Sequence, residues 1–238
     1  MRKLGIIGGT SWTSTALYYE HLNRAIARQL GGLHSARLTI ESLDFAELEA
    51  LQRAGDWDAI AKLYVDAGRK LEAADAEGLL MACNTTHKIY DSLVAGTKVR
   101  VLHIGDAVAE RLVADRVNRA ALLGTRFTMT EPFIRARIEQ RGVQIVPVEE
   151  TWIGEVDRII FEELAVGRVV RDSQRKLKTL ITELGKQRVQ AVVLGCTELV
   201  LAVDVRANVL PVYDTTAIHA AAAVEWMVAD EEVARAAA

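Results

Sequence analysis

Short apolar runs alternate along the chain with longer segments in which apolar residues recur at every third or fourth position. An apolar run of four to eight residues is typical of a buried strand, and the longer spacing is typical of a helix with one buried face. This alternation predicts an α/β fold in which helices join parallel strands. The expected strands are Leu4–Gly8, Leu38–Leu43, Gly78–Ala82, Val99–Ile104, Ala120–Gly124, Val143–Val148, Val189–Gly195 and Val209–Tyr213. Helical spacing is clearest in His21–Leu30, Trp57–Ala73 and Ser173–Leu184, and Pro132 stands where a further helix would begin.

The expected strands fall into two sets of four, and short sequence patches recur in the same order in both sets. Gly9-Thr10-Ser11 matches Gly124-Thr125-Arg126, and Val101–Asp106 matches Val209–Asp214. The two cysteines of the chain lie between these patches, and the offset drifts by a few residues from one patch to the next. Such drift is typical of two related lobes with loop insertions. Chance similarity among short α/β segments is the alternative.

We therefore expect two pseudo-symmetric lobes, each a four-stranded parallel sheet flanked by helices. Residues 1–105 and 213–238 would form the N-terminal lobe, to which the C-terminal helix returns, and residues 106–212 would form the C-terminal lobe. Equivalent residues of a duplicated lobe meet at the interface between lobes, which is a preferred place for a small-molecule pocket. We expect the active site there.

The composition is that of an ordinary globular protein, with 238 residues, half of them apolar and about a quarter charged. A net charge of -3 does not favour binding to nucleic acid or to an anionic membrane. The apolar start of the chain is too short for a signal peptide, and no apolar stretch approaches the roughly 20 residues of a membrane-spanning helix. These features predict a cytoplasmic protein.

Cys83 and Cys196 each close an expected buried strand and precede small polar residues that suit the start of a helix. In open parallel sheets, ligands bind at the carboxyl ends of the strands. Two buried, inert cysteines are the alternative, but a matched pair at equivalent strand ends favours two thiols that face one substrate from opposite sides. Racemisation needs that arrangement, because one base removes a proton and an acid on the other face returns one.

Several polar residues beside these strand ends are candidates for holding a substrate. Hydroxyl, amide and backbone groups there can donate hydrogen bonds to a carboxylate, and ordinary helix capping is the alternative role. Glu198 either orients Cys196 or is a solvated residue of a first helical turn. His87, one turn beyond Cys83, is either a catalytic or a core histidine. The candidates for substrate binding are Thr10, Asn84, Thr85, Thr125 and Thr197, together with Gln52 and Glu198.

Other kinds of site are disfavoured by spacing. The opening Gly5-Ile6-Ile7-Gly8-Gly9 lacks the third glycine of a dinucleotide fingerprint, and no phosphate-binding loop motif occurs. No clustering of histidine, cysteine and acidic residues is typical of zinc, so we expect no metal. A cysteine hydrolase would pair a thiol with His87, His103 or His219, but it leaves the second cysteine unexplained.

At these residues the sequence resembles the cofactor-independent aspartate/glutamate racemase family. The resemblance extends over nearly the whole chain and is most specific at Cys83-Asn84-Thr85, at Gly195-Cys196-Thr197-Glu198 and at Asp214. It implies two α/β lobes with the active site between them, a homodimer, and no pyridoxal phosphate or other cofactor. It also implies that Cys83 acts on the D-enantiomer and Cys196 on the L-enantiomer, while the threonines and Asn84 hold the α-carboxylate and amino group.

The sequence departs from two branches of that family. Gly9-Thr10-Ser11 and Glu198 differ from the residues of cell-wall glutamate racemases. The basic residues that several aspartate racemases use are absent. The segment Phe45–Gln52 contains no basic residue, and Arg53 lies beyond the expected position of the arginine. Val166 stands at the expected position of the lysine. The nearest likeness is a branch with aspartate/glutamate or broad-specificity activity. The expected function is racemisation of aspartate, glutamate or related polar amino acids. The alternatives are maleate isomerase or a related two-cysteine enzyme, and a non-catalytic amino-acid binding protein.

Overall fold

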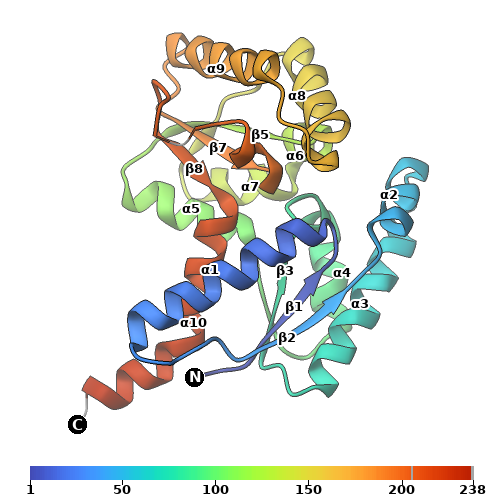
Figure 1. The fold of residues 1–238 in the computed structure, drawn as a ribbon, viewed down its shortest axis with the longest axis vertical. Coiled ribbons are helices and arrows are strands. Elements are labelled where there is room, and N and C mark those ends of the chain that lie inside the picture. Colours follow the sequence, from blue (N-terminus) through green and yellow to red (C-terminus); the bar gives the residue numbers. More distant parts are fainter. Residues whose placement is uncertain (205, 237–238) are drawn as a thin grey trace. The chain divides into compact units, whose positions relative to one another are not determined.

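The computed structural model of the chain describes residues 1–204 and 206–236, with side chains described to residue 229. The chain forms two compact units (Figure 1). Unit 1 comprises Met1–His103 and the chain from His219 onward, and unit 2 comprises Ile104–Ile218. The chain leaves unit 1 after the last strand of that unit and returns to it inside the C-terminal helix.

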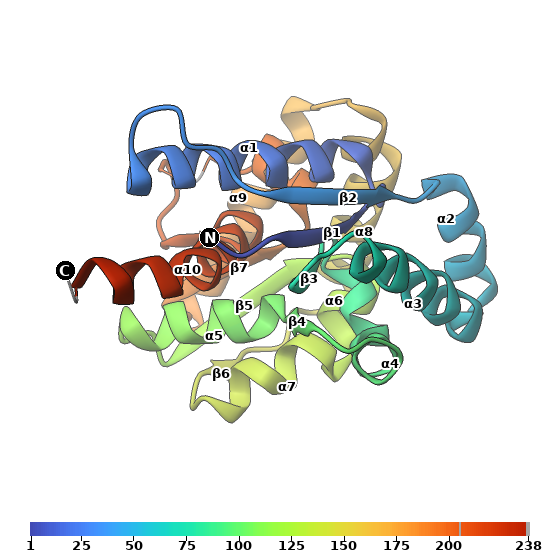
Figure 2. The same cartoon turned by 90° about the horizontal axis from the view of Figure 1, so that it is seen from below.

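Unit 1 is built on a four-stranded parallel sheet with the strand order β2-β1-β3-β4. Figure 2 shows the four strands following one another in this order. The two central strands, β1 and β3, are buried along their whole length. Burial on both faces explains why their sequences are continuous apolar runs without polar alternation. The strands span Leu4–Gly8 (β1), Leu38–Ser42 (β2), Gly78–Met81 (β3) and Arg100–Leu102 (β4).

Helices cover both faces of this sheet. The side chains of Ile6 and Leu80 pack with α1 and α10 on one face, whereas those of Ile7 and Leu79 pack with α2, α3 and α4 on the other. Successive residues of a strand point to opposite faces, so a single buried strand supplies both cores. The helices span Trp12–Leu30 (α1), Phe45–Ala54 (α2), Trp57–Ala73 (α3), Tyr90–Gly96 (α4) and Thr215–Ala236 (α10).

Unit 2 repeats this construction with the strand order β6-β5-β7-β8, again parallel. Leu122 and Val193 pack with α5 and α7 on one face, and Leu123 and Leu194 pack with α8 and α9 on the other. Its strands span Arg119–Gly124 (β5), Gln144–Ile145 (β6), Ala191–Gly195 (β7) and Val212–Asp214 (β8). Its helices span Ile104–Ala114 (α5), Arg126–Thr130 (α6), Pro132–Gln140 (α7), Glu150–Glu162 (α8) and Arg171–Lys186 (α9).

The two sheets have the same order when their strands are numbered within each unit. Strand β3, which precedes Cys83, therefore corresponds to β7, which precedes Cys196, and β1 corresponds to β5. The expected α/β fold with two four-stranded parallel sheets flanked by helices is confirmed.

The structure corrects several expected boundaries. The first helix begins at Trp12, well before the expected His21. The strand expected over Val143–Val148 is only Gln144–Ile145. The last strand begins at Val212, because Val209 is 64% exposed and lies outside the sheet. An apolar run alone did not distinguish these loop residues from strand residues.

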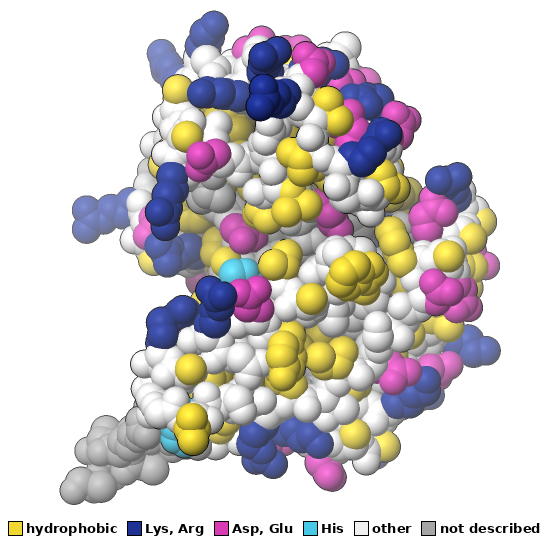
Figure 3. All heavy atoms as spheres, viewed as in Figure 1, with side chains coloured by type: hydrophobic (Ala, Val, Ile, Leu, Met, Phe, Trp, Pro, Cys, Tyr) yellow, Lys and Arg dark blue, Asp and Glu magenta, His cyan; other side chains and the backbone are white. Residues whose placement is uncertain are grey.

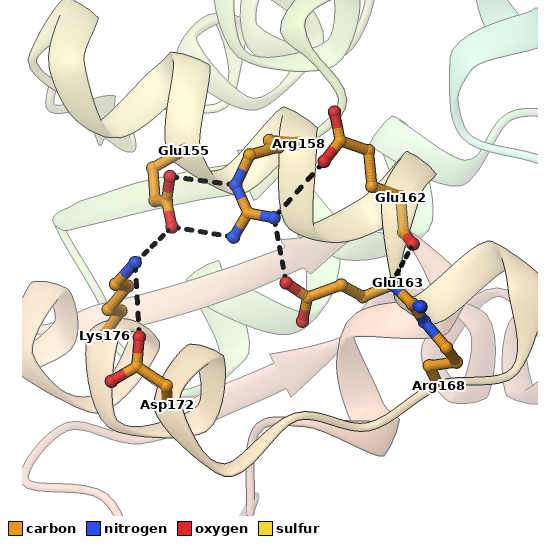
Figure 4. A network of polar contacts seen from close by, with 7 residues as sticks. All are labelled: Glu155, Arg158, Glu162, Glu163, Arg168, Asp172 and Lys176. Atoms are coloured by element: carbon orange, nitrogen blue, oxygen red, sulfur yellow. Dashed lines mark hydrogen bonds and ion pairs between the residues drawn. The ribbon is translucent and has the colours of Figure 1, made fainter.

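Charged side chains link α8, α9 and Glu163, the residue before the short 3₁₀ helix Leu164–Val166 (Figure 4). The Arg158 guanidinium forms two hydrogen bonds with Glu155, at 2.9 and 3.2 Å, and one of 2.9 Å with Glu163. Lys176 joins α9 to this network through Glu155, also at 2.9 Å. The hydrogen bonds from Arg158 and Lys176 lower the pKa of Glu155 to about 2. The network joins α8 to α9, the two helices that cover one face of the unit 2 sheet.

No helix in the described part of the chain is both long enough and apolar enough to span a membrane.

Candidate active site

Cys83 and Thr10 follow neighbouring strand ends in unit 1. Ile7 of β1 is in register with Met81 of β3, so the two parallel strands end at the same edge of the sheet. Gly9 sits between β1 and Thr10 with φ +93°, and a Cβ there would lie 2.0 Å from the Leu43 carbonyl oxygen. Only glycine fits this close backbone approach, and it places Thr10 beside the end of β3.

Side-chain donors fix the backbone around Cys83. Ser14 Oγ donates to the Ala82 carbonyl at 2.6 Å, and His87 Nδ1 donates to the Cys83 carbonyl at 2.8 Å. Thr86 Oγ1 also donates to the Cys83 carbonyl, at 3.3 Å. Ser14, Thr86 and His87 are buried, whereas Cys83 is half-buried. Hydrogen bonds from three side chains therefore fix the backbone that carries the Cys83 thiol.

A buried tyrosine hydroxyl lies beside this cysteine. The Oη of Tyr64, on α3, is 3.1 Å from Thr10 Oγ1, and the Tyr64 side chain is 0% exposed. Burial, with the nearby Cys83 as a second cause, raises the pKa of Tyr64 well above its usual value. Tyr64 is therefore a neutral hydroxyl at physiological pH.

Three buried histidines lie behind Cys83. The ring of His87 is 4.6 Å from that of His103 and 5.7 Å from that of His219, centroid to centroid. His219 Nε2 donates to the Leu102 carbonyl at 3.2 Å, which leaves Nδ1 to accept the hydroxyl of Tyr18 at 2.9 Å. Burial, and next the proximity of His87, lower the pKa of His219 well below its usual value.

Among the described residues, no group of three or more histidine, cysteine, aspartate or glutamate side chains is arranged to hold a metal ion. The imidazoles of His87 and His219 instead bind backbone carbonyls and a tyrosine hydroxyl.

In unit 2, Cys196 lies at the end of β7 in contact with an acidic side chain. Its Sγ donates to Glu198 Oε2 at 3.0 Å, and Thr197 Oγ1 donates to the same oxygen at 2.7 Å. All three residues come from one short loop, so the arrangement follows from local sequence. The carboxylate accepts the thiol proton and thereby favours the protonated form of Cys196.

Thr125 takes the place after β5 that Thr10 takes after β1. Its Oγ1 accepts a hydrogen bond from the Thr128 backbone N–H at 3.4 Å and lies 3.2 Å from Thr128 Oγ1. Thr125 is thus the N-cap of α6, the role that was the alternative to substrate binding. A cap uses the hydroxyl as an acceptor, so its proton can still be donated to another group.

The segments that follow the two cysteines are short 3₁₀ helices, Thr85–Ile89 and Thr197–Leu201. The first continues directly into α4, whereas the second ends after five residues.

A family model described as Asp/Glu/Hydantoin racemase matches residues 7–223, which is most of the chain. This chain belongs to the Asp/Glu/hydantoin racemase family. The family is named for racemases, which are isomerases, and the match includes both cysteines and the residues around them.

Similar proteins agree with this membership. A Yersinia pestis protein proposed to be an Asp/Glu racemase is 41% identical, with a TM-score of 0.90 over 96% of this chain and 100% of the other. An aspartate racemase homologue from Pyrococcus horikoshii is 32% identical, with a TM-score of 0.83 over 95% and 99%. The broad-specificity amino-acid racemase RacX of Bacillus subtilis is 23% identical over 73% of this chain and 75% of its own length.

The structure of this racemase-family chain places the candidate residues in two groups. Thr10, Asn84 and Thr85 lie with Cys83 at the β1 and β3 ends of unit 1, and Thr125, Thr197 and Glu198 lie with Cys196 at the β5 and β7 ends of unit 2. Gln52 is buried on α2, the helix that packs on α3. The roles of all these residues in binding or catalysis stay predictions.

Sequence reasoning missed Tyr64. It stands in a helix whose apolar spacing was recognised, and there it was indistinguishable from an ordinary core residue. Its phenolic oxygen was the available signal, since a buried tyrosine hydroxyl usually has a polar partner.

Proposed function

We propose that this chain is a cofactor-independent racemase that interconverts the L- and D-enantiomers of aspartate, glutamate or related polar amino acids. The observation that carries the proposal is the equivalence of Cys83 and Cys196. Each thiol follows a central buried strand, and the two strands hold the same place in sheets of the same order. Family membership supports the reaction class, and the two thiols supply its acid and its base.

In the proposed reaction, one sulfur is a thiolate and the other a thiol. The thiolate takes the α-proton, so the C–H bond breaks, an S–H bond forms and the electron pair stays on the α-carbon. The opposite thiol then gives its proton to the other face of that carbon and becomes a thiolate. Cys83 is assigned to the D-enantiomer and Cys196 to the L-enantiomer. Each turnover exchanges the protonation states of the two thiols.

The proposed substrate site uses the polar groups beside both thiols. Hydroxyl, amide and backbone N–H groups donate hydrogen bonds to the α-carboxylate, as anion recognition by neutral donors requires. Glu198 accepts a hydrogen bond from the Cys196 thiol, and the Cys83 loop contains no corresponding acidic residue. The proposed binding residues are Thr10, Gln52, Asn84, Thr85, Thr125, Thr197 and Glu198.

We also propose that units 1 and 2 are the two lobes of one enzyme and that each lobe supplies one thiol to the reaction. A racemase base and acid must reach opposite faces of one carbon, and each unit supplies one thiol. The lobes expected from the sequence, residues 1–105 with 213–238 and residues 106–212, belong to this proposal.

The substrate assignment rests on relatives and on charge. RacX is named for broad specificity, and the Pyrococcus horikoshii protein is an aspartate racemase homologue. In this chain Arg53 is exposed and pairs with Glu49, and Val166 is 64% exposed. Neither position supplies a buried cation for a side-chain carboxylate, which favours a range of polar substrates over one acidic one.

The test is exchange of the α-proton in D₂O. The protein is incubated, without added cofactor, with a panel of L- and D-amino acids, and the α-proton signal is followed by NMR. Loss of that signal for aspartate, glutamate or a polar relative supports the proposal. Exchange only after addition of pyridoxal phosphate, or conversion of maleate to fumarate without amino-acid exchange, contradicts it. Binding of an amino acid without any exchange indicates the non-catalytic alternative.

A cytoplasmic homodimer completes the proposal. Trp226, in the apolar C-terminal stretch Ala217–Val228, packs in unit 1 against Gly78 and Arg2 and therefore does not support a dimer face there. The support lies on α1, where Trp12 and Tyr19 are 72% and 53% exposed two turns apart, and Figure 3 shows hydrophobic side chains along this helix. Light scattering should give twice the monomer mass of 26.1 kDa. A monomer at micromolar concentration contradicts the dimer.

A further inference from the structure

Aromatic rings form a continuous series behind Cys83 in the described part of unit 1. In order of contact they are Tyr90, His103, His87, His219 and Tyr18. Neighbouring rings lie 4.6 to 5.7 Å apart, centroid to centroid, and each pair meets edge to face. Aromatic pairs favour this arrangement, and His87 lies at the centre of the series.

The ring nitrogens of the series bind the backbone just beyond neighbouring strands. His219 Nε2 donates to the Leu102 carbonyl of β4 at 3.2 Å, and the Tyr18 hydroxyl binds its other ring nitrogen at 2.9 Å. His87 Nδ1 donates to the Cys83 carbonyl at 2.8 Å, just beyond β3. The series therefore connects β4 to the backbone of the proposed base.

The bond from His87 to Cys83 determines what the imidazole can do. A carbonyl oxygen can only accept, so Nδ1 of His87 carries a proton. This bond is shorter than the one that Thr86 Oγ1 donates to the same oxygen, at 3.3 Å. His87 is 1% exposed, so its ring offers almost no surface to a substrate. His87 thus acts on the backbone that carries the thiol, and not on the reacting atoms.

The two histidines that flank His87 lie where the chain leaves unit 1 and where it returns. His103 is the last residue before the chain passes into unit 2, and His219 is the first residue of unit 1 after it. Both are buried, and both pack their rings against His87. These contacts lie within unit 1, and they link the Cys83 loop to both ends of the chain segment that forms unit 2.

We propose that His87 is a positioning residue for Cys83 and that the rings of His103 and His219 hold it in place. Its Nδ1–H fixes the Cys83 carbonyl, and with it the position from which the sulfur reaches the α-carbon. Proton transfer is sensitive to such placement, because a displacement of about 1 Å can cost roughly 10²-fold in rate. This inference rests on the proposed function of Cys83. His87 is then neither a catalytic histidine nor a passive core residue, the two roles that the sequence left open.

The test compares variants that keep or lose the Nδ1 donor. In a Cys196→Ser background Cys83 is the one remaining thiol, so exchange of the D-enantiomer's α-proton in D₂O reports on it alone. His87→Leu removes the donor, and kcat for this exchange should fall about 10- to 100-fold. His87→Asn places an amide N–H close to the position of Nδ1 and should recover most of that loss. No loss in His87→Leu, or no recovery in His87→Asn, overturns the proposal.

The second thiol separates positioning of Cys83 from a general defect. In a Cys83→Ser background, the α-proton of the L-enantiomer exchanges through Cys196, which belongs to unit 2. His87→Leu should reduce this exchange far less than it reduces exchange of the D-enantiomer through Cys83. Equal losses in the two backgrounds would indicate a role in overall stability alone and overturn the proposal.

A measurement on the loop itself does not depend on racemisation. The backbone N–H of His87 donates to the Asn84 carbonyl at 3.1 Å, so amide hydrogen exchange reports on this turn. His87→Leu should speed exchange in residues 83–89 about tenfold, the effect of losing one hydrogen bond. Unchanged exchange overturns the proposal. Faster exchange in a protein that racemises no amino acid would refute the proposed function and leave the positioning of Cys83 intact.

The matched control is Tyr90→Phe. It removes the hydrogen bond to the Val101 carbonyl, at 3.2 Å, but keeps the ring that packs on His103. Exchange through Cys83 should stay near the parent rate, and a loss as large as that of His87→Leu overturns the proposal.

Two further variants extend the test. His103→Ala removes a ring that contacts His87 and should lower exchange through Cys83, and an unchanged rate overturns the role of the flanking rings. If His87→Leu does not fold, His87→Gln keeps a polar side chain but places its amide near Nε2 instead of Nδ1. It should show the same loss, and a parent rate in that variant overturns the proposal.

Discussion

At the scale of single residues, the chemistry lies in groups that the sequence brings together in two different ways. Cys196, Thr197 and Glu198 are adjacent in the chain, so their hydrogen bonds could be expected from the sequence alone. The contact between Thr10 and Tyr64 joins residues 54 positions apart. Its existence depends on how α3 packs on the sheet, which no local pattern specifies.

Glu198→Gln should make Cys196 easier to ionise. The carboxylate beside the sulfur disfavours a second negative charge, and the amide keeps an acceptor without that charge. In a Cys83→Ser background, where Cys196 is the one remaining thiol, the pH midpoint for alkylation should fall by about one unit. Glu183→Gln is the control, because that carboxylate accepts from Trp152 Nε1. Equal midpoints for the parent and Glu198→Gln would show that the carboxylate does not hold the thiol proton.

His219 should make unit 1 sensitive to acid. Its pKa is lowered in the folded state, so below about pH 6.5 the unfolded chain binds a proton that the folded chain does not. Stability is therefore present above that pH and is lost as the pH falls. Between pH 7.5 and 5.5 the free energy of unfolding should drop by about 1.3 kcal/mol from this group.

Urea unfolding at the two pH values measures that drop. His219→Gln should be less stable than the parent at pH 7.5, because it loses the bond with Tyr18, but its own pH-dependent drop should be smaller by the same amount. His34→Gln, at an exposed histidine, should keep the parent's pH dependence. A drop in His219→Gln equal to that of the parent would exclude His219 as the titrating group.

At the scale of elements, the buried central strands were predictable because burial on both faces leaves an unbroken apolar run. Leu4–Gly8 was predicted to the residue, and so was Trp57–Ala73, whose apolar stripe packs on one face of the sheet. The loop around Val209 was mistaken for a strand. Val209 is exposed there while Leu210 packs against the core of unit 2, and only tertiary structure determines whether a short apolar run joins a sheet.

Arg158→Met should destabilise unit 2. Arg158 pairs with Glu163, whose side chain is only 6% exposed, so its loss leaves a buried carboxylate without this cation. We expect a loss of about 1–3 kcal/mol in the free energy of unfolding. Arg24→Met is the control, because the Arg24–Glu20 pair on α1 is well exposed and should contribute little. Similar losses in both variants would show that the network in Figure 4 is not a special support for α8 and α9.

At the scale of the whole molecule, the repeat seen in the sequence is a repeat in structure. Both units have the same strand order, and each ends a central strand with a cysteine loop. The repeat is visible in the sequence at the glycines and cysteines after the central strands, because backbone geometry restricts the glycine positions and chemistry restricts the cysteine positions. Tyr64 and the histidines behind Cys83 belong to unit 1 alone, and a comparison of the two halves could not reveal them.

The two-thiol reaction is tested most directly by exchange of the α-proton in D₂O with the single-cysteine variants. Cys83→Ser keeps Cys196, so it should exchange the α-proton of the L-enantiomer and return deuterium to the same face. Cys196→Ser should do the same with the D-enantiomer. A serine hydroxyl is a far weaker acid–base than a thiol at neutral pH, so complete racemisation should fall by roughly 10²–10⁴-fold in each variant.

Circular dichroism should show both variants folded, since serine nearly matches cysteine in volume. The account predicts enantiomer-specific exchange with almost no racemisation, in opposite senses for the two variants. Racemisation at the parent rate by either variant would contradict it, because the cysteine replaced in that variant would then be only structural.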